Sequence, residues 1–229
     1  AVQQGYAVCF SYHSQQQIAE ALVQELQDLN KAAQGIAVQA DLSQETAICQ
    51  LFEACDQAYG RLDALVHNAG ILEQQMRVQA MDSARLQRIL STNVIGSFIC
   101  AREAIKRMST ELGGQGGAIV NVSSVAARLG APFEYVDYAA SKGAIDSFTL
   151  GLAKEVANVG IRVNAVRPGI IHTEIHASGG EPNRVERVKT SIPMQRGGYP
   201  EEVASAILWL VSEQASYTSG AILDVAGGR

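Results

Sequence analysis

The sequence predicts an α/β protein in which helices cover both faces of a doubly wound parallel sheet. Three observations lead to this prediction. Short apolar segments of strand length alternate along the 229 residues with longer segments whose apolar residues repeat at helical spacing. The strand-length segments are apolar almost throughout, which is typical of strands buried on both faces. Small and polar residues directly follow several of them, and in such sheets ligands bind at these strand ends.

Three strands and two helices are expected in the first third of the chain. The strands are rich in β-branched and aromatic residues, and they cover residues 6–12, 36–40 and 62–67. The first helix is expected from a Ser14 cap to about residue 31, and the second from a Ser43 cap to Tyr59, because a serine hydroxyl can bind the free N–H groups of a first turn. The apolar face of the first helix carries Ile18, Leu22, Leu26 and Leu29.

The rest of the chain continues this alternation. Asp82 is expected to cap a long helix that ends near Gly113-Gly114, since glycine favours helix ends. Pro200 suits the first turn of another helix. Residues 174–198 are polar and rich in Gly and Pro, which predicts a mobile flap with one short helix. The remaining expected elements are strands at 118–124, 161–166 and 221–225 and a helix at 138–158.

Composition limits the class of protein. Hydrophobic residues make up 47% of the chain and charged residues 18%, so residues 1–229 are expected to fold as one domain with a sizeable core. A net charge of −5 argues against nucleic acid as a partner. No apolar run approaches the roughly 18 residues that span a bilayer, so no membrane partner is expected. The four cysteines form no C-x-x-C pair and lie in apolar segments, which predicts reduced thiols and a cytoplasmic protein.

One pair of residues suggests an acid–base centre. Tyr138 and Lys142 are four residues apart at the start of an expected helix, so they share one of its faces. An ammonium beside a phenol favours the phenolate and lowers the phenol pKa from its usual value of about 10. Alone, the pair is a weak signal, because helices contain such pairs by chance on solvated faces.

The weight of this pair comes from other motifs along the chain. Asn68-Ala69-Gly70 follows one strand directly, and Pro168-Gly169 with Thr173 follows another. Together with residues 195–202 and 223–228, their order and spacing resemble the classical short-chain dehydrogenase/reductase family over nearly the whole chain. The family's catalytic tetrad is matched by Asn93, Ser124, Tyr138 and Lys142. Within the family, the chain looks most similar to glucose dehydrogenases and 3-ketoacyl reductases, which implies a Rossmann-type fold of three layers.

The chain departs from the family pattern in three places. The family begins with a strand and a T-G-x-x-x-G-x-G loop that holds the cofactor pyrophosphate. Residues 1–5 look like the end of the helix after that loop, so the first strand and glycine loop are expected to precede them. His67 stands where the family has an asparagine, which we interpret as a structural substitution. The segment between Ser124 and Tyr138 is one residue longer than usual and is expected to line the substrate mouth.

The resemblance implies hydride transfer between a nicotinamide cofactor and a small carbonyl or alcohol. Tyr138 would be the general acid in reduction and the general base in oxidation. Lys142 would lower the pKa of Tyr138 and bind the nicotinamide ribose. Ser124 would hold the substrate oxygen, and Asn93 would hold a water that links the lysine to solvent. Ser123 precedes Ser124, but strand alternation directs it to the other face.

The resemblance also implies the cofactor contacts. Asp41 and Leu42 would bracket the adenine. NAD calls for an acid at the end of the first strand of this chain, where Tyr12 and His13 stand, so NADP is favoured and NAD remains possible. The implied cofactor residues are Tyr12, His13, Asp41, Leu42, Asn68, Ala69, Gly70, Tyr138, Lys142, Pro168, Gly169, Ile171 and Thr173.

Other functions remain open. A regulator or scaffold of the same fold would bind NAD(P) without turnover, although such relatives commonly lose the tyrosine or the lysine. An epimerase or dehydratase with tightly held NAD would usually carry a larger C-terminal region. A zinc site at His172, Glu174 and His176 is not expected, because these residues lie on an irregular segment.

The expected partners are a small-molecule substrate and further copies of the chain. Residues 71–80, 125–137 and 175–189 would line the substrate, and they mix apolar residues with few charges, which favours a neutral or weakly polar carbonyl or sugar-like alcohol. The family is commonly tetrameric. The resemblance therefore implies a homotetramer, or a homodimer, that pairs through the helices near 83–110 and 138–158 and through the last strand.

Overall fold

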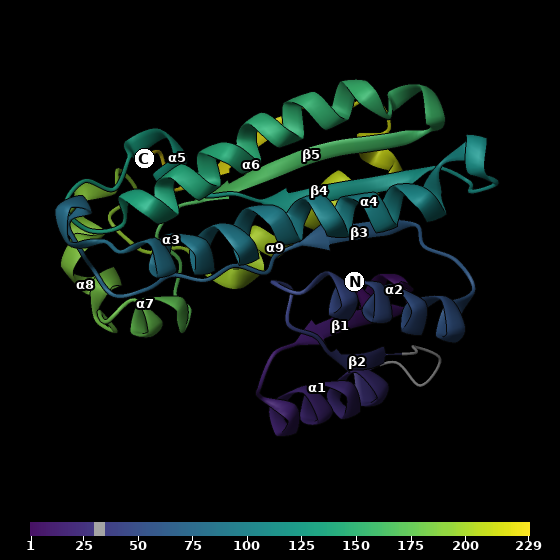
Figure 1. The fold of residues 1–229 in the computed structure, drawn as a ribbon, viewed down its shortest axis with the longest axis horizontal. Coiled ribbons are helices and arrows are strands. Elements are labelled where there is room, and N and C mark those ends of the chain that lie inside the picture. Colours follow the sequence, from purple (N-terminus) through teal and green to yellow (C-terminus); the bar gives the residue numbers. More distant parts are fainter. Residues whose placement is uncertain (30–34) are drawn as a thin grey trace.

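The computed structural model describes residues 1–29 and 35–229 and has an α/β fold with parallel strands (Figure 1). The strands are β1 (Val8–Tyr12), β2 (Gly35–Gln39), β3 (Ala64–His67), β4 (Gly117–Val122), β5 (Ile161–Pro168) and β6 (Ile222–Val225). Each strand pairs in parallel with its neighbours. The predicted fold class is confirmed, and within the described residues the sheet has two parts, β1-β2 and β3-β4-β5-β6.

Helices follow the strands in the predicted order. The longer ones are α1 (Gln16–Leu29), α2 (Glu45–Tyr59), α3 (Ser83–Leu90), α4 (Gly96–Met108), α6 (Val136–Glu155) and α9 (Pro200–Val211). The shorter helices α5 (Ala126–Leu129), α7 (Ile175–Ser178) and α8 (Arg184–Val188) lie in the segments after β4 and β5. The predicted flap therefore contains two short helices rather than one. No helix in the described part of the chain is both long and apolar enough to cross a membrane.

The core lies on both faces of β4. Ile119 packs in a cluster with Met108 of α4 and Leu152 of α6, whereas its neighbour Val120 packs in a second cluster with Val203 of α9. Successive strand residues point to opposite faces, so α4 and α6 cover one face and α9 covers the other, as Figure 1 shows. The first cluster continues to α2 and the loop after β2, and it thereby joins the two parts of the sheet.

Two local predictions near the N-terminus are wrong. The predicted buried face of α1 is largely exposed, with Ile18 at 63% and Leu29 at 53%. The physical reason is that α1 packs against the narrow β1-β2 sheet, where Leu26 lies against Gly35 and little else of that face is covered. Ser43 does not cap α2, because the helix begins one residue later, after Gln44, and the Ser43 hydroxyl accepts a hydrogen bond from Gln44 Nε2 (3.1 Å). The predicted end of the first helix near residue 31 lies outside the described residues.

The predicted long helix after Asp82 is two helices joined by a π-helical turn. The Asp82 carboxylate caps α3 as predicted, since its Oδ1 accepts a hydrogen bond from Arg85 N (2.8 Å). The π-helical turn spans Ser91–Ile95, and α4 then ends at Met108, before the predicted glycines. Such turns are frequent at functional sites because they redirect the side chains on either side.

Parallel pairing brings the carboxyl ends of the strands to one edge of the fold. His67 at the end of β3 is in register with Asn121 near the end of β4, and Val122 is in register with Val166 of β5. The loop after β2 reaches the same region. A Cβ atom on Gly96 would lie only 2.4 Å from Leu42 O, so a glycine is required where this loop meets α4. Ligands bind at this edge in parallel α/β folds.

Candidate active site

Tyr138 and Ser124 meet where β4 ends and α6 begins. Ser124 is the second residue after β4, and its Oγ accepts a hydrogen bond from Ala126 N (3.1 Å) in the following turn. Tyr138 is the third residue of α6, and its phenol is hydrogen-bonded to the Ser124 side chain. Ser123 is buried and donates its hydroxyl to Lys142 O (3.1 Å). The two serines therefore differ as strand alternation predicts, and only Ser124 contacts the tyrosine side chain.

Asn93 is buried in the π-helical turn and connects two other segments. Its Oδ1 accepts a hydrogen bond from Ile71 N (2.7 Å), and its Nδ2 donates to Ile71 O (3.0 Å) and to Ser141 Oγ (3.1 Å). Ser141 lies on α6 between Tyr138 and Lys142. The amide thus fixes the loop after β3 against the helix that carries both residues. The implied role of Asn93 in holding a water stays a prediction.

Lys142 lies at the base of the site. Its Nζ donates to Val122 O (2.7 Å) and is 5.7 Å from the centroid of the Tyr138 ring. A Cβ atom on Gly70 would lie 3.3 Å from this Nζ and 3.4 Å from Asn93 Oδ1, so the glycine leaves space beside the ammonium. Burial lowers the pKa of Lys142 to about 8, while the charge of Asp146 acts in the opposite direction. An ammonium with this pKa can give up its proton near neutral pH.

The pKa of Tyr138 differs from the sequence expectation. Burial raises the pKa of Tyr138 to about 12, and the hydrogen bond with Ser124 opposes this increase without reversing it. The ammonium of Lys142 was expected to lower this pKa, but it lies against the ring face and is bound to Val122 O. At neutral pH the phenol therefore keeps its proton, and it can donate that proton to an oxygen held beside Ser124.

The residues expected to contact adenine lie at the ends of β1 and β2. Tyr12 is the last residue of β1, and the side chain of His13 is 74% exposed, with Nε2 4.0 Å from Asp41 Oδ2. Hydrogen bonds to Ser43 lower the pKa of Asp41, so the carboxylate is charged at neutral pH. Leu42 is buried in the core. The structure thus brings these predicted residues to one edge of the fold.

The residues expected to contact nicotinamide lie at the ends of β3 and β5. Asn68, Ala69 and Gly70 leave β3 directly and lead past Lys142. Pro168 ends β5, and the next residue, Gly169, donates its N–H to Val225 O (2.9 Å). A Cβ atom on Gly169 would lie 2.8 Å from Ala226 Cα, so this close approach requires glycine. Ile171 is buried beside Gly198, and Thr173 is exposed just before α7.

The histidines near α7 have structural contacts. His172 stacks on Tyr199, with ring centroids 5.1 Å apart. His176 is buried, and its Nε2 is hydrogen-bonded to Ile171 O (2.8 Å). No group of three His, Cys, Asp or Glu residues with metal-binding geometry occurs within residues 1–29 and 35–229.

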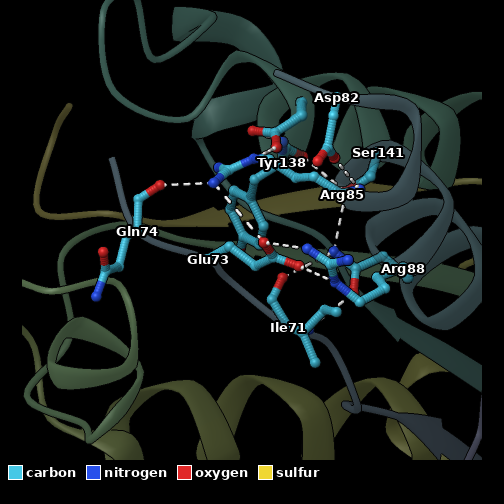
Figure 2. A network of polar contacts seen from close by, with 10 residues as sticks. Ile71, Glu73, Gln74, Asp82, Arg85, Arg88, Tyr138 and Ser141 are labelled. Carbon is cyan, nitrogen blue, oxygen red and sulfur yellow. Dashed lines mark hydrogen bonds and ion pairs between the residues drawn. The ribbon is translucent and has the colours of Figure 1, made fainter. Parts of the chain in front are cut away.

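Sequence analysis missed the ion pairs around the first turn of α6 (Figure 2). Arg85 Nε donates to Asp137 Oδ2 (2.6 Å), and both side chains are almost fully buried. Glu134 accepts hydrogen bonds from Arg184 (2.5 Å) and Arg187 (3.0 Å) of α8. The only available signal was the acidic residue directly before Tyr138. Its partner is 52 residues away in the sequence, and periodicity does not reveal such a pairing.

Comparison with known proteins agrees with this geometry. A family model described as "Enoyl-(Acyl carrier protein) reductase" matches residues 1–229. The chain is 58% identical to the uncharacterized oxidoreductase YgfF of Escherichia coli (strain K12), over 99% of this chain and 91% of that protein. It is 36% identical to Glucose 1-dehydrogenase 2 of Bacillus subtilis (strain 168), over 96% of this chain and 84% of that protein.

Solved structures of similar fold add the cofactor class. A blue fluorescent protein from a metagenomic library, in complex with NADPH, superimposes with a TM-score of 0.87 at 30% identity, over 98% of this chain and 88% of that chain. The acetoin dehydrogenase YohF of Salmonella typhimurium superimposes with a TM-score of 0.84 at 33% identity, over 99% of this chain and 88% of that chain.

Fold, site and relatives together define an NAD(P)-dependent oxidoreductase that acts on CH–OH groups. More particularly, the chain belongs to the classical short-chain dehydrogenase/reductase family. The residues present fit a nicotinamide dinucleotide, because Gly70 places no side chain beside the Lys142 ammonium, and the exposed His13 and Thr173 follow the ends of β1 and β5.

Proposed function

We propose that this protein transfers a hydride between NADP and a small, uncharged carbonyl or alcohol. One observation carries the proposal: Tyr138, Ser124, Lys142 and Asn93 converge at the carboxyl edge of the parallel strands, where ligands bind in such folds. The cofactor supplies the hydride when it is bound. We further propose a single cytoplasmic domain over residues 1–229, a location supported by four free thiols, with a mobile flap near residues 174–198.

The roles of the four residues follow from their contacts. The Ser124 hydroxyl holds the substrate oxygen beside the Tyr138 phenol, which is its hydrogen-bonding neighbour. Tyr138 donates its proton to that oxygen in reduction and takes it back in oxidation. Lys142 binds the ribose from the space beside Gly70 and returns a proton to the phenol. Asn93 keeps the loop after β3 against α6. Positioned proton transfer of this kind contributes about 10²–10⁴-fold in rate.

The charge arrangement at the mouth supports an uncharged substrate. Glu73 is paired with Arg88 (2.8 Å), and Glu134 is paired with Arg184 and Arg187. A charged substrate would have to compete with these pairs, since they occupy most ionic side chains of the predicted lining segments. Arg77 differs, because its guanidinium lies over the Phe133 ring. An uncharged carbonyl needs only the Ser124 and Tyr138 hydroxyls.

The end of β1 supports NADP over NAD. The residues there, Tyr12 and His13, are without an acid that would bind the ribose 2′-hydroxyl and repel a 2′-phosphate. The exposed His13 ring is available to a phosphate. We expect kcat/KM to be at least tenfold higher with NADPH than with NADH. An equal or greater value with NADH would contradict this preference.

The central experiment measures oxidation and reduction of a panel of sugars, small alcohols, aldehydes and ketones by the absorbance of the reduced nicotinamide. At least one substrate should be turned over, and Tyr138→Phe should reduce kcat by about 10²–10⁴-fold, because it removes the proton donor without changing the shape of the ring. Tyr217→Phe is a matched control, since it makes the same chemical change on a fully exposed ring. Cofactor binding without turnover of any substrate would favour the regulator or scaffold.

A further inference from the structure

Arg85 is a buried cation that joins three segments of the site. It lies on α3 with a side chain only 4% exposed. Its Nε donates to Asp137 Oδ2 (2.6 Å) at the start of α6, and its Nη1 donates to Gln74 O (2.8 Å) in the loop after β3. Figure 2 shows this guanidinium between the loop and the helix. A buried charged group stays with its partner, because separation would leave an uncompensated charge in the protein interior at a large cost in free energy.

Asp137 links Arg85 to the catalytic Tyr138. Its second carboxylate oxygen, Oδ1, accepts a hydrogen bond from Tyr138 N (2.9 Å). The carboxylate therefore binds Arg85 with one oxygen and the tyrosine backbone with the other. Its side chain is 1% exposed, so water does not substitute for either contact. If the Arg85 guanidinium moved, the backbone of Tyr138, which carries the phenol, would move with it.

Arg85 and Asn93 both join the loop after β3 to α6, and they do so at opposite ends of the contact between these two segments. Asn93 binds Ile71 of the loop and Ser141 of α6, while Arg85 binds Gln74 of the loop and Asp137 of α6. Both the loop and the first turn of α6 are therefore fixed at two points, one on each side of Tyr138. The loop segment between these points is part of the predicted substrate lining.

We propose that Arg85 is a positioning residue that, with Asp137, holds Tyr138 and the 71–74 loop segment in register with each other. The inference rests on the proposed function, in which Tyr138 delivers a proton to a substrate held by that loop. Arg85 touches neither substrate nor cofactor. Its loss should therefore reduce the rate of the chemical step while the binding of NADPH, which uses other strand ends, is retained.

The test uses Arg85→Met, Arg85→Lys and the double variant Arg85→Met/Asp137→Leu. Replacing both partners of a buried ion pair costs less stability than removing one, so the double variant should recover much of the thermal stability lost in the single variant. Its kcat should nevertheless stay at least tenfold below wild type, because neither Gln74 nor Tyr138 is held. Arg85→Lys should recover part of kcat, since an ammonium can bind Asp137 but does not reach both partners.

The control is Arg107→Met on α4, which removes a partly buried pair with Asp56 of α2 (2.7 Å) and leaves the contacts of the 71–74 loop segment in place. Its kcat should stay within twofold of wild type. All variants are assayed well below their melting temperatures, together with the Kd of NADPH. Low kcat with unchanged NADPH affinity in Arg85→Met and in the double variant supports the proposal. Recovery of kcat together with stability in the double variant, or a parallel loss of NADPH affinity, would overturn it.

Amide hydrogen exchange tests the positioning role of Arg85 independently of the proposed function. If wild type turns over no substrate, the proposed function fails, and positioning is then decided by amide exchange. Arg85→Met should accelerate exchange by about tenfold at residues 71–77 and in the first turn of α6, while β4 stays protected. Unchanged exchange in both segments would overturn the positioning role whether or not the protein is an active oxidoreductase.

Discussion

His67 is a buried imidazole whose protonation state follows from its neighbours. The Ser97 hydroxyl donates its only hydrogen to Asn93 O (2.8 Å), so the 3.2 Å contact between Ser97 Oγ and His67 Nδ1 requires the proton on Nδ1. His67 Nε2 then carries a lone pair and is buried without a hydrogen-bond partner among the described residues. Burial, together with the nearby Lys142 charge, lowers the pKa of His67 to about 4.

This shift predicts a loss of stability in mild acid. In the unfolded chain a histidine has a pKa of about 6.5, so between pH 6.5 and 4 the unfolded state binds the extra proton. The stability contributed by neutral His67 is therefore complete above pH 6.5 and declines as the pH falls towards 4. At pH 5 the loss is about 2 kcal/mol. For a chain of this length that corresponds to a melting temperature lower by about 4–8 °C.

His67→Asn should remove this pH dependence, because asparagine does not titrate. Thermal unfolding at pH 7.5 and pH 5 measures the effect in both proteins. The decrease in Tm between the two pH values should be smaller in the variant by several degrees. His172→Asn provides the control, since it replaces an exposed ring. Equal pH dependence in wild type and His67→Asn would contradict the assignment.

At the scale of single residues, the sequence predicted which side chains form the site better than it predicted their electrostatic environments. Order and spacing along the chain selected Tyr138, Ser124, Asn93 and Lys142, and the structure brings all four together. The pKa direction of Tyr138 was wrong because it depends on how deeply the phenol is buried. Burial of the phenol depends on how distant segments pack around it. The spacing of two residues on one helix carries no information about that packing.

At the scale of elements, an ionic cluster joins the flap to residues 125–135 between β4 and α6, here called the substrate loop. Arg184 of α8 donates to Glu134 (2.5 Å) and to Glu181 (2.9 Å), and its guanidinium lies 5.0 Å from the centroid of the Tyr135 ring. Tyr135 in turn donates its hydroxyl to Gly179 O (3.1 Å). The segment after β4 and the segment after β5 therefore meet over the site through side chains with low exposure.

Glu134→Gln should weaken the contact between the flap and the substrate loop. The amide keeps the shape of the side chain but removes the charge that two arginines share. Partly exposed pairs of this kind contribute about 1 kcal/mol, so exchange of flap amides should accelerate by roughly fivefold. The KM of the substrate should rise severalfold while the Kd of NADPH changes little. Amide exchange over residues 175–188 and steady-state kinetics measure the two effects.

Glu186→Gln is the matched control on the same flap. It removes an exposed pair with Lys189 (2.5 Å) that does not reach the substrate loop. Equal effects of the two substitutions, or none from Glu134→Gln, would mean that the ionic cluster does not close the flap.

Elements were predicted with different success for physical reasons. Strands and long helices have clear apolar repeats, and β3, β4, β5 and α6 lie within a few residues of their predicted positions. The π-helical turn was not predicted, because one extra residue in a helical turn keeps the apolar repeat on either side and shifts only its phase. The flap helices α7 and α8 are too short to produce a repeat, and polar contacts with the substrate loop determine how they pack.

At the scale of the whole molecule, several surfaces expose apolar side chains, and two of them bear on assembly. Phe98 of α4 is 51% exposed and packs against Phe148 of α6 with 4.0 Å between the ring centroids, and Leu150 of α6 is 45% exposed. The second surface lies along the edge strand β6 and α9, where Leu223 is 39% and Trp209 is 41% exposed. Exposed apolar side chains that contact one another, as Phe98 and Phe148 do, are typical of sites that bind other proteins.

These two surfaces coincide with the helices and the strand through which a homotetramer was expected to form. We predict that light scattering will give a molar mass about four times that of the 24.4 kDa chain. Phe98→Glu should reduce the mass to that of a dimer, because a carboxylate would be buried without a partner in the interface between helices while the β6 surface stays intact. Ile18→Glu, on the exposed face of α1, should leave the mass unchanged. A monomeric wild type would contradict the tetramer, and a tetrameric Phe98→Glu would place the interface elsewhere.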